Sequence, residues 1–231
     1  MKRFYAALLV LSLMLGKFCF AESPTDLDSP LVDSSRADRE FLRARDAFER
    51  RNLKSLLAAR NLFRKDLRAY PLADYVEYWW LFASLAPAPA TAVAETADYQ
   101  AFLATAPTGP LVDSIRREWL KALARNEQWA LFNSEFPLII SEDAELTCQQ
   151  WRYRLQQADR EAMAEARTLW KSARPAPDAC YDVFGRINLD TEARWARVRA
   201  LLAANQLADA RRTAAGIDKL PAGFERATAT I

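Results

Sequence analysis

Three kinds of side chain in this sequence could take part in chemistry: clustered acids, cysteines and aromatic rings. Histidine, the commonest general acid–base catalyst, does not occur. Glu142, Asp143 and Glu145 could supply the two carboxylates of an acid–base pair, but this cluster directly follows Ser141. An N-cap residue followed by acids is typical of a helix start, because the positive end of the helix dipole favours negative charge. We therefore interpret this acidic cluster as the beginning of a helix.

Aromatic side chains beside polar groups are the usual stacking platforms of a sugar-binding groove. Tyr78, Trp80 and Tyr99 are the candidates for glycan contact in this sequence. Packing between helices is the alternative for each ring, and it is the interpretation that we favour. The sequence contains no phosphate-binding loop, dinucleotide fingerprint or G-x-S-x-G motif, and two distant cysteines do not make a zinc site. We therefore expect no catalytic residue, no metal and no cofactor.

The first 21 residues have the pattern of a secretory signal peptide. Lys2 and Arg3 precede an apolar run at 6–15, and a small-x-small sequence ends at Ala21. This run is too short for a typical membrane span, and no second run occurs. The pattern predicts export through a cleavable signal, without a membrane span.

Removal of residues 1–21 would change the charge of the chain. The whole sequence has a net charge of +2, but this segment carries three basic residues and no acid, which leaves 29 basic and 30 acidic residues. A net charge of −1 without a clustered basic face does not favour a nucleic-acid partner.

The cysteines that remain after removal of residues 1–21 are Cys148 and Cys180. In an oxidising compartment a disulfide is the default, and a pair of free thiols in the core is the alternative.

The stretch 70–85 is the part around which the other elements are predicted to lie. Pro71 can occupy the first turn of a helix, where its missing N–H costs nothing. Apolar residues then recur at helical spacing, and the segment from Tyr78 to Phe82 is apolar all round. A helix of that kind is covered on more than one side, so we predict the buried middle of a stack of helices.

Similar patterns predict about eleven helices joined by short loops, including one over 53–70 and others capped by Ser141 and Thr191. Beta-branched residues are sparse, and alternating patterns are short. We expect an all-α, right-handed superhelix (solenoid) of antiparallel helix pairs. It would span 36–231 after a flexible leader at 22–35. A final helix from near Gly223 has no end signal before Ile231, which suggests a truncated domain.

Several motifs together resemble the soluble lytic murein transglycosylases. Tyr70-Pro-Leu-Ala-Asp-Tyr-Val-Glu-Tyr78 is close to a Tyr-Pro-Leu-x-x-Tyr-x-x-Tyr helix of that family. Further matches follow in the expected order and at about the expected spacing. They are Ile115–Ala124, Trp129, Cys148, Leu169-Trp170, Pro177–Asp182 and 195–210.

The resemblance implies the N-terminal helical superhelix of a periplasmic enzyme that cuts peptidoglycan glycan strands. Its partners would be those strands and the lysozyme-like catalytic domain of the same longer protein. That domain is absent here, and the one Glu-Ser pair, Glu22-Ser23, lies in the leader, so no catalytic residue carries over. Cys148 and Cys180 carry over as a disulfide. A free-standing exported adaptor that binds protein partners remains the alternative function.

Overall fold

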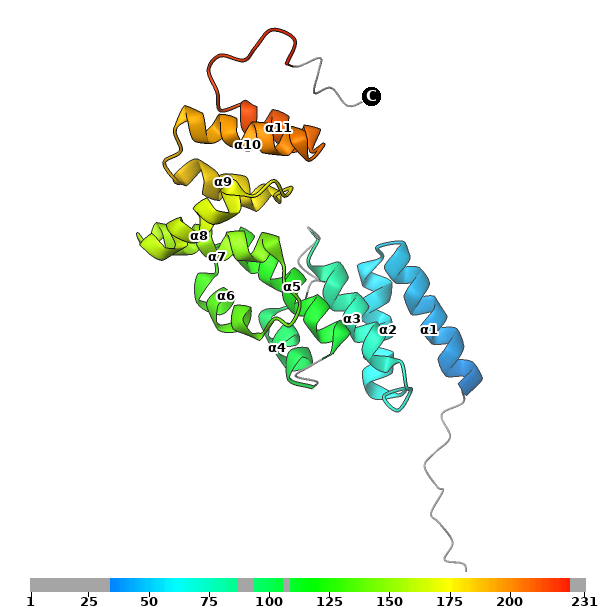
Figure 1. The fold of residues 1–231 in the computed structure, drawn as a ribbon. Helices are drawn as coiled ribbons and strands as arrows, with labels where there is room; N and C mark the ends of the chain where they lie inside the picture. Colours follow the sequence, from blue (N-terminus) through cyan, green and yellow to red (C-terminus); the bar gives the residue numbers. More distant parts are fainter. Residues whose placement is uncertain (1–33, 87–93, 106–108, 225–231) are drawn as a thin grey trace, which may run out of the picture.

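A computed structural model describes residues 34–86, 94–105 and 109–224 (Figure 1). The predicted signal peptide, most of the leader and nearly all of the predicted last helix lie outside these ranges. The described part contains eleven α-helices and one short 3-10 helix, and no strand. The helices are α1 (Ser34–Glu49), α2 (Leu53–Lys65), α3 (Ala73–Ser84), α4 (Thr96–Thr105), α5 (Pro110–Arg125), α6 (Trp129–Glu135), η2 (Phe136–Leu138), α7 (Ala144–Gln156), α8 (Arg160–Lys171), α9 (Asp178–Arg186), α10 (Thr191–Ala203) and α11 (Leu207–Ala214).

The helices stack in chain order, from α1 at one end to α10 and α11 at the other (Figure 1). Most helices contact their neighbours in sequence or the helix after the next one, as in the pairs α1·α3, α3·α5, α5·α7 and α7·α9. Antiparallel pairs arranged in this way form the expected all-α superhelix. None of the helices in the described ranges combines the length and apolar character needed to cross a membrane.

Four corners of the stack are built in the same way. Arg51, Glu127, Ala158 and Asn205 have φ between 54° and 57°, and each ends one helix of a pair. The following residue sends its N–H back to the carbonyl five positions earlier, as Asn52 does to Ala47 at 2.8 Å. This backbone pattern satisfies free carbonyls at a helix end. The corners therefore repeat in geometry although the repeats differ in length.

The core is divided along the stack. One cluster of buried apolar residues joins α1 to α7 around Trp80, Leu81 and Trp119. Smaller clusters lie between α1, α2 and α3, between α7, α8 and α9, and beside α10 and α11. Each helix pair thus buries its apolar face mainly against adjacent pairs, which is the energetic pattern of a solenoid.

Helix α3 is the covered helix that its composition predicts, since it contacts α1, α2, α4 and α5. Its fully buried face, however, carries Val76, Trp80 and Leu81, whereas Tyr75 is 39% exposed. The prediction for Pro71 was wrong, because α3 starts at Ala73 after the N-cap Leu72. The second helix likewise ends at Lys65 rather than Tyr70. The residue before a proline disfavours the α conformation, which fits an irregular chain over 66–72.

Two predicted caps were displaced by neighbouring aspartates. Asp143, not Ser141, caps α7 by accepting the N–H of Leu146 at 3.1 Å. Asp190, not Thr191, caps α10 by accepting the N–H of Ala193 at 2.7 Å. Aspartate is as good an N-cap as serine and better than threonine. In each case the aspartate directly before the first helical residue is the cap.

Candidate functional site

The centre of the first helical layers is a buried arginine on an indole ring. The guanidinium carbon of Arg60 lies 3.6 Å from the centroid of the Trp80 ring. Nε of Arg60 donates to Glu77 Oε1 at 2.9 Å, and Nη2 donates to Asp98. The arginine is only 7% exposed, and a charge buried to this extent requires partners. Two acids, one from α3 and one from α4, neutralise it. This cluster ties α2, α3 and α4 into one wall.

The three rings predicted to contact glycan occupy different positions in this wall. Trp80 and Tyr99 are 2% and 4% exposed, which leaves little surface for a ligand. Tyr99 stacks on Trp119 with 5.1 Å between ring centroids and donates its hydroxyl to Leu81 O. Burial, with a smaller effect of neighbouring Asp98, raises the pKa of the Tyr99 hydroxyl. Both rings therefore serve packing between helices, which is the interpretation that the sequence favours for them.

Tyr78 differs from the other two rings because it is only partly buried. Its hydroxyl lies 3.1 Å from Ser114 Oγ on α5, and its ring lies 5.8 Å from that of Phe82. A half-buried ring with a hydrogen-bonded hydroxyl presents both an apolar face and a polar edge. Tyr78 is the predicted glycan contact that keeps an accessible surface.

The acidic cluster at the start of α7 is organised by basic residues of α5. Asp143 lies 3.2 Å from Lys121 Nζ and 3.7 Å from Arg117 Nη1. Glu145 also approaches Lys121, at 3.6 Å. Burial would lower the pKa of Lys121, but Glu118 and Asp143 outweigh it, so this pKa is raised. These contacts agree with a helix start that is fixed to its neighbour. Within 34–86, 94–105 and 109–224, no group of three or more metal-binding side chains occurs.

Asp113 in the first turn of α5 fastens the loop between η2 and α7. It is 4% exposed and accepts the N–H of Ile140 at 2.7 Å. Burial would raise the pKa of this carboxyl. Bonds from Ile140 and Ser141, together with the charge of Arg117, outweigh burial and hold the pKa below its usual value. The hydroxyl of Ser141, which the sequence suggested as a helix cap, donates a hydrogen bond to Asp113 instead.

We expect Asp113→Asn to lower the free energy of unfolding by about 2 kcal/mol at neutral pH, because a buried charged acceptor is lost. The folded pKa is depressed, so the carboxylate stabilises the fold above its ordinary pKa of about 4 and loses this effect as pH falls through the folded pKa. Denaturant unfolding across pH should show the two proteins converging in acid. Asp182→Asn, at an exposed position of α9, should change little. A constant difference at every pH would contradict the prediction.

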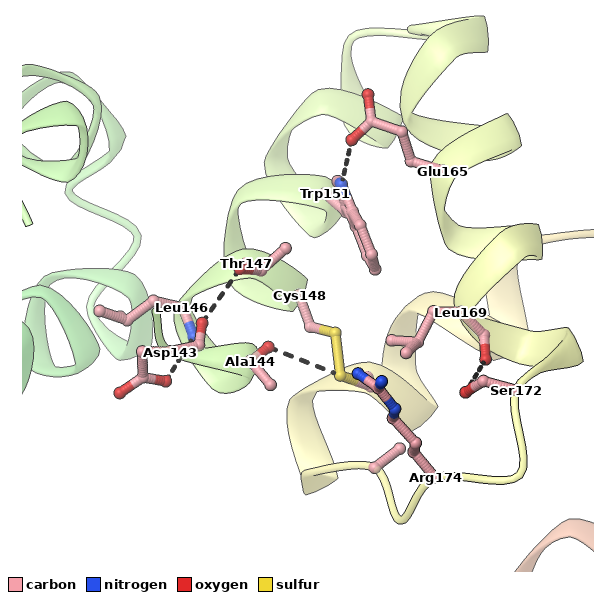
Figure 2. The surroundings of a disulfide bond; sticks show 12 residues. Asp143, Ala144, Leu146, Thr147, Cys148, Trp151, Glu165, Leu169, Ser172 and Arg174 are labelled. Atoms are coloured by element: carbon pink, nitrogen blue, oxygen red, sulfur yellow. Dashed lines mark hydrogen bonds between the residues drawn. A yellow bond between two sulfur atoms is a disulfide. The ribbon is translucent and has the colours of Figure 1, made fainter. Parts of the chain in front are cut away.

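A disulfide joins α7 to α9 through Cys148 and Cys180 (Figure 2). The two Cα atoms lie 4.9 Å apart, and both residues are fully buried. Figure 2 shows Trp151 and Leu169 beside the bond. Trp151 donates its indole N–H to Glu165, with 2.6 Å between the two atoms. The predicted pairing of the two cysteines is present, and it lies within the α7–α9 core cluster.

A second buried arginine, Arg197 of α10, was not identified from the sequence. It is 2% exposed and donates to the carbonyls of Trp170 and Ser172, at 2.7 Å each. These carbonyls lie at and just beyond the C-terminal end of α8, where a positive charge is favoured. An arginine in an amphipathic pattern is normally assigned to the solvated face, so periodicity alone gave no signal for it.

Comparison with solved structures shows the same helical arrangement in lytic transglycosylases. An inactive mutant of lytic transglycosylase Slt from Pseudomonas aeruginosa aligns at 25% identity and a TM-score of 0.61, over 80% of this chain and 29% of that one. The 70 kDa soluble lytic transglycosylase Slt70 from Escherichia coli aligns at 22% identity and a TM-score of 0.59, over 85% and 30%. Its complex with bulgecin A gives 22% and 0.57 over the same shares.

The chain thus spans about 30% of the length of these enzymes. No family model matches the sequence, and no curated protein matches it either. The fold matches over at least four fifths of this chain, in proteins that the sequence motifs also indicate. Because the match covers less than a third of those enzymes, this chain is similar to one part of them. The expected resemblance to the soluble lytic transglycosylases is confirmed, and it concerns their helical superhelix.

Proposed function

We propose that this chain forms the non-catalytic N-terminal helical domain of a periplasmic soluble lytic transglycosylase. Its curved wall would position peptidoglycan glycan strands for cleavage of the MurNAc–GlcNAc bond by a lysozyme-like domain of the same longer protein. The observation that carries this proposal is the alignment of 80–85% of the chain with lytic transglycosylases. The export pattern of residues 1–21 and the Cys148–Cys180 bond support a periplasmic location.

Within this function, Tyr78 is the residue that we propose for glycan contact. Its partly buried ring sits on α3 and its hydroxyl meets Ser114 of α5, so it lies where two helices of the wall join. A sugar ring can stack on such a surface, and binding costs less conformational entropy when the aromatic side chain is already held in place. Truncation of Tyr78 should therefore weaken binding without removing a catalytic group.

The test is co-sedimentation of the purified chain with peptidoglycan sacculi, followed by analysis of released muropeptides. We expect a fraction of the protein to pellet with sacculi and no 1,6-anhydromuropeptides to form. Tyr78→Ala should reduce the pelleted fraction, whereas Tyr75→Ala, the more exposed tyrosine on the same helix, should not. Anhydromuropeptides made by the pure chain would contradict the non-catalytic role. Capture of one defined protein partner without sacculus binding would favour the adaptor function instead.

A further inference from the structure

A hollow of about 260 Å³ lies between α2, α3 and α4, and charges of both signs line it. Its apolar lining includes Phe63, Ala73 and Phe102. Three arginines of α2 and the segment after it, at positions 60, 64 and 68, lie four residues apart and reach the same hollow. Arg60 and Arg64 share one face of α2 because of this spacing, whereas Arg68 reaches the hollow from the irregular segment that follows the helix.

Most of these charges are already paired. Arg60 is bound by Glu77 and Asp98, and Arg64 Nε lies 3.2 Å from Glu77 Oε2. The side chain of Glu77 is 12% exposed and serves both arginines, while that of Arg64 is 52% exposed. Two cations and two acids therefore balance within the wall. The two Nη groups of Arg64 make no ion pair within the part of the chain that the structure describes.

Two charges remain after this pairing, one of each sign. Arg68 and Asp74 both line the hollow and are exposed, and among the described residues neither forms an ion pair. They are not paired with each other, although they flank the same opening. A positive and a negative group held apart over an apolar floor are complementary to a molecule that carries both charges.

We propose that this hollow binds a zwitterionic α-amino-acid group, with its carboxylate toward Arg68 and its ammonium toward Asp74. Arg68 offers a planar donor fork for the carboxylate, and the Nη groups of Arg64 extend the same face. The aliphatic part of the ligand lies against Ala73 and Ala101, which are accessible, while Phe63 and Phe102 form the buried layer beneath them. The source of the ligand, a diamino acid in the peptide attached to a glycan strand, rests on the proposed function.

The probe is meso-diaminopimelic acid, which has an amino-acid group at each end, titrated calorimetrically into the purified chain. Pimelic acid keeps only the two carboxylates, and cadaverine keeps only the two ammonium groups. We expect diaminopimelic acid to bind at least about tenfold more tightly than either analogue, because one charge-assisted hydrogen bond contributes on this scale. Equal binding of pimelic acid would show a simple anion site and overturn the proposal, as would no binding of diaminopimelic acid.

Matched variants locate the site. Arg68→Gln and Asp74→Asn should each weaken binding of diaminopimelic acid about tenfold. Arg160→Gln and Asp182→Asn, exposed on α8 and α9, should leave it unchanged. Circular dichroism checks that every variant is folded, and unchanged affinity in both hollow variants would refute the assignment. Sacculus binding without affinity for diaminopimelic acid would reject this site and keep the proposed function, whereas the reverse would reject the function and keep the site.

Discussion

Replacing Arg197 with methionine is expected to lower the free energy of unfolding by about 3 kcal/mol, because one guanidinium serves four backbone carbonyls. Besides the short bonds to Trp170 and Ser172, Nη1 reaches Leu169 O at 3.5 Å and Nη2 donates to Arg174 O at 3.3 Å. The site is closed to water, since Arg197 is 2% exposed. A methionine would fill part of the volume and leave these carbonyls without donors.

An opposing effect keeps the expected loss from being larger. Burying a cation without an acid is costly, and no ion pair to Arg197 occurs among the described residues; its Nε also lacks a partner. The carbonyl end of α8 and the rings of Trp170 and Phe184, about 5 Å away, offset this cost. Because the carbonyls stay behind when the cation is removed, the balance remains destabilising.

Denaturant unfolding with the disulfide intact measures this effect. Arg199→Met is the matched control, because Arg199 lies on the same helix, is exposed and, within the described ranges, forms an ion pair only with exposed Glu192. That control should change the free energy of unfolding by about 0.5 kcal/mol or less. Arg197→Lys keeps the charge but not the planar fork, so it should fall between the two. Equal unfolding midpoints for Arg197→Met and the wild-type chain would disprove the structural role of this arginine.

The sequence was sufficient for the helical fold, the order of the helices and the covered position of α3. Strong 3.6-residue periodicity locates a helix, since its apolar face must be buried whatever the partner. The sequence could not identify which face of α3 is most buried, because residues 78–82 are apolar on every side of the helix and periodicity therefore favours no face. Trp80 is covered by Arg60, which Glu77 and Asp98 hold in place, and Arg60 and Asp98 are 38 positions apart in the sequence.

Local competition explains the other differences. Ser141 and Thr191 are good caps by type, but Asp143 and Asp190 lie beside them and take the position. The role of Ser141 depends on Asp113, which lies 28 positions earlier and becomes its neighbour only in the folded chain. The same holds for the hollow: the spacing of Arg60, Arg64 and Arg68 is visible in the sequence, while the acids that pair two of them come from α3 and α4. For Ser141 and for the hollow, tertiary pairing rather than local propensity decides which residues meet.

Replacing Cys148 and Cys180 together with alanine is expected to lower the free energy of unfolding by about 3–4 kcal/mol, because the bond closes a loop of about 33 residues in the unfolded chain. The loop contains all of α8, and the bond lies within the α7–α9 core cluster. The loss should therefore appear first in that part of the stack, since solenoid stability is a sum of local and neighbouring terms.

Hydrogen exchange locates this effect, and denaturant unfolding gives its size. In the double alanine variant, amides of α7, α8 and α9 should lose protection, while those of α3 and α5 should keep theirs, because a separate core cluster holds them. Wild-type protein reduced in denaturant should match the variant, whereas folded protein should resist reduction, since both cysteines are fully buried. An even loss of protection along the whole chain would mean that the stack unfolds as one cooperative unit. In that case the bond would stabilise the entire wall, and the division of the core into successive clusters would have no energetic meaning.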